Sequence, residues 1–458
     1  MSKIILFGAG VYAKKYKALL EYLNMDFDYF TDNDRSKWGG MLYDKPIISP
    51  DKMKEFDSCR IIISCTHEIS IRQQLKELKL DHKVIGMDEL YELCEKKKNS
   101  NKRIDPVTKK SKTVIVDMYE GIGWGGSELW AAQLARLLAD RHMETVLVGG
   151  KEQPPLEDKY ESLTVRITED NTINQMVSLI EENLPCTFIN NFAGCGFLAA
   201  ALLKKIYPDK IKIISVIHND NKSLFDAHML MAHYVDAIFC VSNQIREHMS
   251  SLYSYDYDKY FFKEQPIEVE VYNFLAPIDN MPLRIGYAAR LVKQQKRADL
   301  LIDLIKILEE KNINYLFQIA GDGECLEIIQ NYIRGHKLLD RVELLGRVVK
   351  SKMSEFWKRQ DVFVNISEYE GTSLSMLEAM SYNCVPVVTD VSGAKEFISH
   401  GINGFICQIN DFSKMAEYIE KLSLDRKMLQ IFGKRSREVI VKKCNVEEYI
   451  TYWTKYLI

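Results

Sequence analysis

The chain has 458 residues, of which 47% are hydrophobic and 27% charged, and a formal net charge of −3 at pH 7. This length allows two or three domains, and the composition is that of an ordinary globular protein rather than a disordered or fibrous one. The near-neutral charge indicates no nucleic-acid partner, and no stretch approaches the roughly 18 apolar residues of a membrane span.

Ten cysteines are scattered along the chain without a Cys-x-x-Cys pair or a Cys/His cluster. This pattern favours reduced thiols of a cytoplasmic protein over disulfides or a zinc site. The N-terminus enters an apolar strand at once and lacks the layout of a signal peptide. We therefore expect a cytoplasmic protein, with any membrane contact peripheral at the inner face.

The first 95 residues are expected to form a small Rossmann-like α/β domain. The sequence KIILFGAG at 3–10 predicts a strand that runs into a glycine turn, and Asp32 follows about twenty positions later. Glycines in such a turn with a later acidic residue are typical of nucleotide sites, although Ala13 replaces the third glycine of that fingerprint. Gly8, Gly10 and Asp32 therefore indicate either a nucleotide or sugar-nucleotide site, or a Rossmann-shaped contact module with no ligand.

Residues 95–112 carry eight basic and two acidic side chains and almost nothing apolar. This composition predicts a flexible linker. Because basic clusters are attracted to anionic lipid, a peripheral contact with a membrane surface is the alternative.

A second α/β domain is predicted to begin at Thr113. Its first strand leads into a loop with four glycines in six residues, the last two being Gly125 and Gly126, ahead of a helix. Glycines let the backbone approach a ligand, and a helix N-terminus favours negative charge. Further along, a strand at 211–217 ends at His218, which is either structural or a cleft residue.

The third α/β domain is predicted to begin near Leu283. A strand at 284–288 delivers Arg290, and Lys296 follows six residues later. Two cations where a strand opens into a loop suit a diphosphate, since Arg can bind it with two hydrogen bonds and Lys as a point charge. A generic solvated loop is the alternative for this basic segment.

The most informative stretch follows an apolar strand at 361–366. A short loop, Glu370-Gly371-Thr372-Ser373, leads into a predicted helix at 374–381 and a strand at 385–389. In parallel α/β units, ligands lie at the carboxyl ends of strands, where helix N-termini point. The free amides at about Thr372 to Leu374 are expected to hold a phosphate or a sugar hydroxyl.

Glu378 lies on that helix, which is apolar nearly all round and therefore predicted to be buried. A buried carboxylate without partners is costly. Together with Glu370, it suits a ligand rich in hydroxyl groups, because carboxylate oxygens accept hydrogen bonds. The alternative is a solvated loop Glu and a helix-capping Glu.

Glu370 and Glu378, with Gly371 beside the first, match the E-x7-E pattern of family 4 retaining glycosyltransferases, whose loop usually has the form E-G-F/T-G/S. The chain resembles this family over about 113–458. The resemblance implies a GT-B fold, with two Rossmann-like domains facing a cleft, in addition to the small N-terminal α/β domain. That N-terminal domain itself resembles those of PglD-type sugar acetyltransferases. We expect an accessory domain at 1–95, a basic linker at 96–112, an acceptor domain at 113–278, a donor domain at 279–445, and a C-terminal helix at 446–458 that crosses back to the acceptor domain.

The resemblance also implies a role for each site residue. The donor's diphosphate would be held by Arg290, Lys296 and the backbone of Gly371, Thr372, Ser373 and Leu374, with Gly125 and Gly126 opposite. Glu378 would bind the ribose, Glu370 the donor sugar and His218 the transferred sugar, while backbone groups at Arg347 and Val348 would hold the base. The implied reaction needs a nucleotide sugar, most commonly a UDP sugar, and a saccharide or lipid-linked acceptor of cell-surface polysaccharide synthesis. It implies no cofactor and no metal, so the Asp-x-Asp strings at Asp32/Asp34 and Asp256/Asp258 are interpreted as incidental.

Two hypotheses from other classes stay open at this point. One is an NAD-dependent oxidoreductase or epimerase built on the N-terminal glycine turn, which explains nothing after residue 112. The other is a non-catalytic scaffold of a polysaccharide assembly complex, against which the intact Arg290, Lys296, Glu370 and Glu378 argue.

Overall fold

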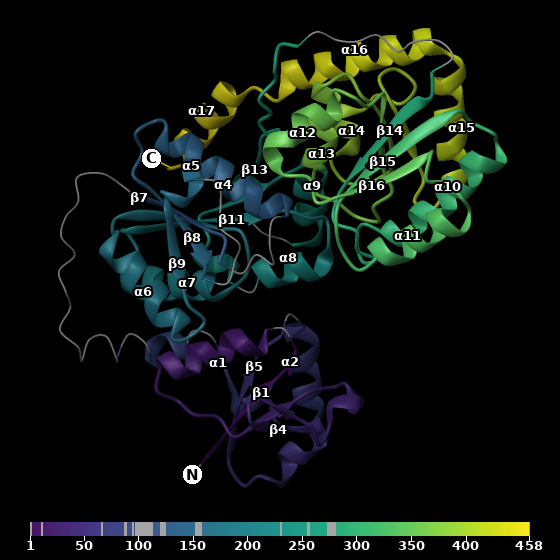
Figure 1. Cartoon of the computed structure of the whole chain (residues 1–458). Helices are drawn as coiled ribbons and strands as arrows, with labels where there is room; N and C mark the ends of the chain where they lie inside the picture. The colour runs from purple at the N-terminus through teal and green to yellow at the C-terminus, as the bar shows by residue number, and fades with distance from the viewer. Residues whose placement is uncertain are drawn as a thin grey trace. The chain divides into compact units, whose positions relative to one another are not determined.

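The computed structural model of the chain is shown in Figure 1. It describes residues 2–10, 12–65, 67–86, 89–93, 96, 113–119, 125–151, 158–229, 231–253, 257–272 and 281–457. Contacts define two compact units, Met1–Val216 with Lys222–Ile238, and Ile217–Asn221 with Phe239–Ile458. The predicted linker at 96–112 lies outside the described residues except for Lys96, and the domain boundaries given above stay predictions.

The first unit opens with a six-stranded sheet of order β3-β4-β2-β1-β5-β6, in which only β3 runs antiparallel. Its elements are β1 (Lys3–Phe7), α1 (Ala13–Tyr22), β2 (Tyr29–Thr31), β3 (Met41–Leu42), β4 (Lys45–Ile48), β5 (Cys59–Ile63), α2 (Glu68–Glu77) and β6 (Val84–Ile85). The apolar run of β1 is buried at Ile5, Leu6 and Phe7, as expected for a parallel strand covered on both faces. The predicted Rossmann-like start is thus confirmed.

A seven-stranded sheet follows, with the order β13-β12-β11-β10-β7-β8-β9. Its strands are β7 (Thr113–Asp117), β8 (Thr145–Gly150), β9 (Thr164–Ile167), β10 (Cys186–Asn190), β11 (Ile211–Ile217), β12 (Ala237–Cys240) and β13 (Tyr260–Phe262). The connecting helices are α4 (Gly126–Ala139), α5 (Asp158–Glu161), α6 (Thr172–Glu182), α7 (Cys195–Ile206), α8 (Lys222–Met229) and α9 (Asn243–Leu252).

The second unit contains a six-stranded parallel sheet of order β16-β15-β14-β17-β18-β19. Its strands are β14 (Leu283–Ala288), β15 (Tyr315–Ala320), β16 (Val342–Gly346), β17 (Val362–Asn365), β18 (Val385–Thr389) and β19 (Phe405–Cys407). The helices are α10 (Leu301–Glu310), α11 (Leu326–Gly335), α12 (Lys350–Trp357), α13 (Leu374–Ser381), α14 (Ala394–Phe397), α15 (Phe412–Leu424), α16 (Arg426–Lys443) and α17 (Val446–Leu457). Two apolar clusters form its core, one around Leu304 and Phe317 and the other around Trp357 and Met380.

The position of β14 in this sheet decides where a ligand can bind. The chain passes from β14 outward to β15 and β16 on one side, and β17 pairs with the other side of β14. The order therefore reverses between β14 and β17, and such a switch point is where open α/β sheets bind ligands, beyond the carboxyl ends of the strands. Within the described part of the chain, no helix combines the length and the apolar character that crossing a bilayer requires.

Candidate functional site

Two loops meet at this switch point, one after β14 and one after β17. The first carries Lys296 and the second carries Glu370, and the Nζ of Lys296 donates to Oε1 of Glu370 over 2.5 Å. The two side chains are only 16% and 6% exposed. The structure therefore places a buried ion pair where the fold favours ligand binding.

Three donors converge on one oxygen of Glu370. Besides Lys296, Oε1 accepts from Oγ of Ser367 at 2.7 Å and from Nδ2 of Asn365 at 3.4 Å. None of the residues described donates to Oε2. The carboxylate is thus oriented through Oε1, while Oε2 can accept a further hydrogen bond.

At Gly371, the segment that follows β11 packs against the loop that carries Glu370. A Cβ on Gly371 would overlap the carbonyl oxygen of His218 and lie 2.5 Å from Cγ2 of Val241. The backbone N–H of Asp220 donates to the carbonyl of Glu370 at 3.0 Å, and Thr372 Oγ1 donates to the carbonyl of Val241 at 2.8 Å. His218, which is partly exposed, is therefore placed next to Glu370 by backbone packing that only glycine permits at position 371.

Gln295 joins the same three segments, although no sequence motif predicted a role for it. Its Nε2 donates to Oδ1 of Asn219 at 3.1 Å, its carbonyl accepts from the N–H of Glu368 at 2.8 Å, and its Oε1 accepts from Arg290 at 3.4 Å. Its φ is +69°, a left-handed conformation that costs energy for a non-glycine residue and is enriched at functional sites. Arg290 itself is exposed.

A glycine turn between β15 and α11 packs against the loop after β14, which carries Arg290. At Gly323, with φ +146°, a Cβ would lie 2.6 Å from the carbonyl oxygen of Leu291. The N–H of Leu291 donates to the carbonyl of Asp322 at 2.8 Å, and the N–H of Lys293 donates to Oε1 of Glu324 at 2.9 Å. These bonds fix the loop that carries Arg290.

Helix α13 begins directly after the loop that carries Glu370. The N-cap residue Ser373 accepts from the N–H of Met376 at 3.3 Å through its Oγ. The N–H groups of Leu374 and Ser375 donate to none of the described residues, as is usual in a first helical turn. They are available to an anion, and the helix dipole favours one there.

Glu378 differs from the prediction of a fully buried carboxylate. Its side chain is 17% exposed and forms an ion pair with Lys350 at the start of α12. Arg347 and Val348 precede α12; Arg347 is exposed, whereas Val348 packs partly buried against the core. Glu378 does not contact Glu370. Each carboxylate pairs with a different lysine, Glu370 with Lys296 and Glu378 with Lys350.

In the first unit, Gly125 and Gly126 lie where the glycine loop enters α4. The N–H of the N-cap residue Gly125 donates to Oε2 of the buried Glu128 at 3.2 Å, so a side chain of α4 itself satisfies this amide. The preceding loop at 120–124 and Asp256 lie outside the described residues.

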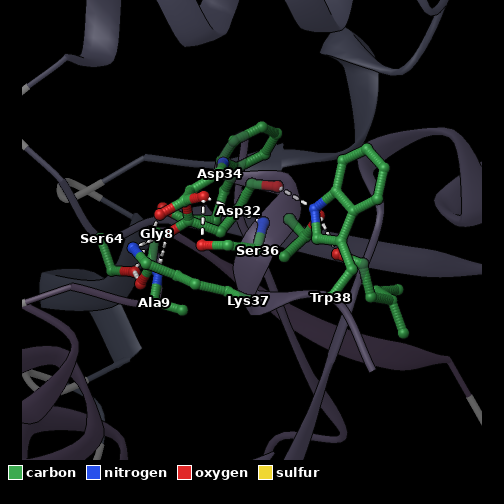
Figure 2. A network of polar contacts seen from close by, with 11 residues as sticks. Gly8, Ala9, Asp32, Asp34, Ser36, Lys37, Trp38 and Ser64 are labelled. Atoms are coloured by element: carbon green, nitrogen blue, oxygen red, sulfur yellow. Dashed lines mark hydrogen bonds and ion pairs between the residues drawn. The ribbon is translucent and has the colours of Figure 1, made fainter. Parts of the chain in front are cut away.

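The N-terminal glycine turn contains a closed polar network (Figure 2). Oδ2 of Asp32 accepts from the N–H of Ala9 at 2.8 Å and from Lys37 at 3.0 Å, while Oδ1 accepts from the N–H of Asp34 at 2.9 Å. Burial raises the pKa of Asp32, but these donors outweigh it and the net pKa is lowered. Gly8 has φ +122°, whereas a Cβ on Gly10 would meet nothing within 4 Å. Asp32 is therefore satisfied by the chain itself, which agrees with the contact-module alternative.

Residues 272–439 match the sequence family described as glycosyl transferases group 1. Residues 1–85 match a second family, C2185-like, N-terminal, so the resemblance to the PglD-type domain is not confirmed. The first match contains β14 to β19 and the loops that carry Arg290, Lys296, Glu370 and Glu378, but not the segment with His218.

Curated relatives carry names of the same class. The chain is 21% identical over 289 residues to N-acetyl-alpha-D-glucosaminyl L-malate synthase of Bacillus anthracis, covering 59% of this chain and 74% of that protein. It is 31% identical over 171 residues to poly(ribitol-phosphate) alpha-N-acetylglucosaminyltransferase of Staphylococcus aureus, covering 37% of this chain and 34% of that protein. With the latter, the chain therefore shares only about a third of the relative's length.

Solved structures show the architecture. Anabaena HepE in complex with UDP and glucose superposes with a TM-score of 0.64 at 14% identity, covering 76% of this chain and 99% of that one. The pneumococcal O-GlcNAc transferase GtfA with UDP and GlcNAc gives 0.62 at 14% identity, covering 76% and 99%. The predicted GT-B-like α/β fold is confirmed, and residues 272–439, which match the glycosyl transferases group 1 family, lie within it.

Proposed function

We propose that the chain is a retaining glycosyltransferase that moves a sugar from a nucleotide-sugar donor, a UDP sugar, to a saccharide or lipid-linked acceptor of cell-surface polysaccharide or glycoconjugate synthesis. The observation that carries the proposal is the buried Lys296–Glu370 pair at the switch point of the group 1 domain. The names of the relatives and the UDP in the similar structures support the class of donor.

Lys296, Arg290 and the open amides of Leu374 and Ser375 would bind the donor diphosphate. Bond cleavage places negative charge on this leaving group, and preorganised donors aimed at developing charge are the main source of such catalysis. Glu370 pairs with Lys296 and neutralises its charge. A phosphate would share or replace that contact, so the cation is held ready without being left buried and unpaired.

Glu370 would accept a hydrogen bond from the donor sugar through Oε2, since Ser367 and Asn365 already fix Oε1. Glu378 would accept from the ribose hydroxyls, backbone groups at Arg347 and Val348 would hold the base, and His218 would donate to the transferred sugar.

In the proposed step, the bond between the anomeric carbon and the phosphate oxygen breaks. The acceptor oxygen bonds to the same face of that carbon, and its proton passes to the leaving phosphate. The cations and amides above supply the charge stabilisation, so no metal is needed in this scheme.

The test is a thermal-shift screen of the full chain with UDP and GDP sugars, because a ligand that binds the native state raises the melting temperature. Donor hydrolysis and transfer are then followed by chromatography, and the anomeric configuration of the product by NMR. Glu370→Gln should abolish turnover, while Glu368→Gln, an exposed neighbour, should not. No stabilisation and no hydrolysis with any donor would refute the proposal, and an inverted product would refute retention alone.

A further inference from the structure

Helix α16 (Arg426–Lys443) differs in charge from the rest of the chain. Its sequence, RKMLQIFGKRSREVIVKK, contains seven cations and a single acid, Glu438, although the whole protein has a net charge of −3. Figure 1 shows it as the long yellow helix along the outside of the second unit. A concentration of one charge on one outer element indicates a surface for a partner of the opposite charge.

The residues of α16 divide into two faces. The side buried against the domain consists of Leu429, Phe432, Gly433, Ser436 and Ile440. The exposed side consists of Lys427, Ile431, Lys434, Arg435, Glu438, Val441 and Lys442. These exposed residues recur at three- and four-residue spacing, so they form one continuous stripe, which we name the α16 outer face.

Two aliphatic side chains interrupt the cations of the α16 outer face. Ile431 is 47% exposed and Val441 is 54% exposed. A lipid–water interface accepts both kinds of side chain, because cations reach the headgroup phosphates and aliphatic groups reach the acyl boundary.

A hollow of about 330 Å³ lies beside the outer face, lined by Asn383, Lys434, Arg437, Glu438, Val441 and Lys442. Arg437 is engaged, since its Nη2 donates to the carbonyl of Glu270 at 2.5 Å and its Nη1 to that of Ser381. Among the described residues, no carboxylate pairs with Lys434 or Lys442. In contrast, Lys311, directly after α10, pairs with Glu420, and Lys414 on α15 pairs with Glu417. The two lysines of the hollow are therefore available to phosphate groups.

We infer that the α16 outer face docks the protein on an anionic lipid bilayer, with its cations at the headgroup phosphates and Ile431 and Val441 at the acyl boundary. A soluble polyanion would use the lysines but would gain nothing from the two aliphatic side chains, so the interleaved pattern favours the bilayer. The inference goes beyond the proposed transferase activity and does not depend on it.

The test is sedimentation of the full chain with vesicles, either of phosphatidylcholine alone or with added phosphatidylglycerol. Binding is expected only with the anionic lipid and should weaken as salt is raised. Each cation near such a surface contributes about five-fold, so Lys434→Gln with Lys442→Gln should lower partitioning by about 25-fold. The matched control is Lys306→Gln with Arg334→Gln, which removes the same charge from exposed positions on α10 and α11 and should change little.

A second pair of variants distinguishes lipid from other anions. Ile431→Ser with Val441→Ser leaves the charge unchanged and should still weaken vesicle binding. The inference would be overturned if the Lys434/Lys442 variant and its matched control bound anionic vesicles equally well. It would also be overturned if the unaltered chain bound neutral and anionic vesicles equally well. If soluble polyphosphate competes fully and the serine variants bind vesicles normally, the surface would be a polyanion site and the assignment to lipid would be wrong. Circular dichroism of each variant separates these outcomes from loss of folding.

Discussion

Lys296 and Glu370 lie 74 positions apart in the chain, yet the lysine Nζ and the carboxylate Oε1 are 2.5 Å apart in the folded protein. A buried ion pair contributes little net stability, because desolvation of both charges offsets their attraction. Its presence at the switch point of the sheet is better explained by function. In the proposed function, each charge would keep the other ready for a ligand that carries phosphate and hydroxyl groups.

The first prediction separates the stability of this pair from its role. Lys296→Met leaves Glu370 buried without its cation and should cost about 3–5 kcal/mol of unfolding free energy. Adding Glu370→Gln removes the unpaired charge and keeps an acceptor for Ser367, so stability should largely return while donor hydrolysis stays absent. Urea unfolding and chromatography measure the two quantities. If the double variant is as unstable as Lys296→Met alone, the two residues are not coupled. If the double variant still hydrolyses the donor, neither residue belongs to the mechanism.

The second prediction concerns Glu378. Glu378→Ala should weaken UDP binding about 10- to 100-fold, as loss of hydrogen bonds to a charged group typically does. Its melting temperature should stay close to that of the wild type, because the carboxylate is partly exposed and its partner Lys350 is half exposed. Calorimetric titration with UDP provides the measurement, and Glu355→Ala on the exposed side of α12 is the control. Unchanged UDP affinity would show that the ribose is bound elsewhere.

The third prediction uses two glycines of the same domain. Gly371→Ala should lower the free energy of unfolding by at least about 1–3 kcal/mol. The reason is that its Cβ would overlap the carbonyl oxygen of His218, and displacing backbone is costly. Gly335→Ala, at the end of α11, meets nothing within 4 Å and should be neutral or slightly stabilising. Thermal denaturation of the pair tests this. Equal melting temperatures would mean that the two loops do not pack as described.

Local patterns in the sequence predicted much of the fold but not the partners of the site. The helix at 374–381 and the strand at 385–389 have the predicted bounds, because apolar runs separated by a short polar loop are local signals. The strand predicted at 361–366 is shorter, Val362–Asn365. The contact of Glu370 with Lys296 depends on the strand order, which periodicity does not contain.

The environment of Glu378 and the importance of Gln295 escaped prediction for the same reason. The apolar sequence around Glu378 indicated a buried carboxylate, but Lys350, from another helix, lies beside it at the surface. Gln295 binds Asn219 and Glu368, two segments remote in sequence, and belongs to no recognisable motif.

The last prediction concerns Glu396 on α14, which the mechanism does not use. Its Oε1 accepts from the N–H groups of Asn243 and Gln244 at 2.6 and 3.3 Å, while its buried Oε2 has no partner among the described residues. Burial raises the pKa of Glu396 to about 7; the two backbone donors and Lys443 oppose this rise, and Glu264 adds to it. The carboxyl group is therefore protonated in the folded chain at pH values where it is ionised in the unfolded chain.

The sign of the pH dependence follows from this difference. Between the ordinary pKa of 4.5 and about 7, the folded state binds more protons, so this residue's contribution to stability falls as pH rises, by up to about 3 kcal/mol. Glu396→Gln keeps an acceptor for both N–H groups and cannot ionise. The variant should match the wild type near pH 4.5 and exceed it in unfolding free energy at pH 8, as measured by urea unfolding at both pH values. Glu327→Gln on the exposed face of α11 should show no such difference. A variant less stable than the wild type at pH 8 would show that Glu396 is ionised and paired in the folded protein, contrary to its buried geometry.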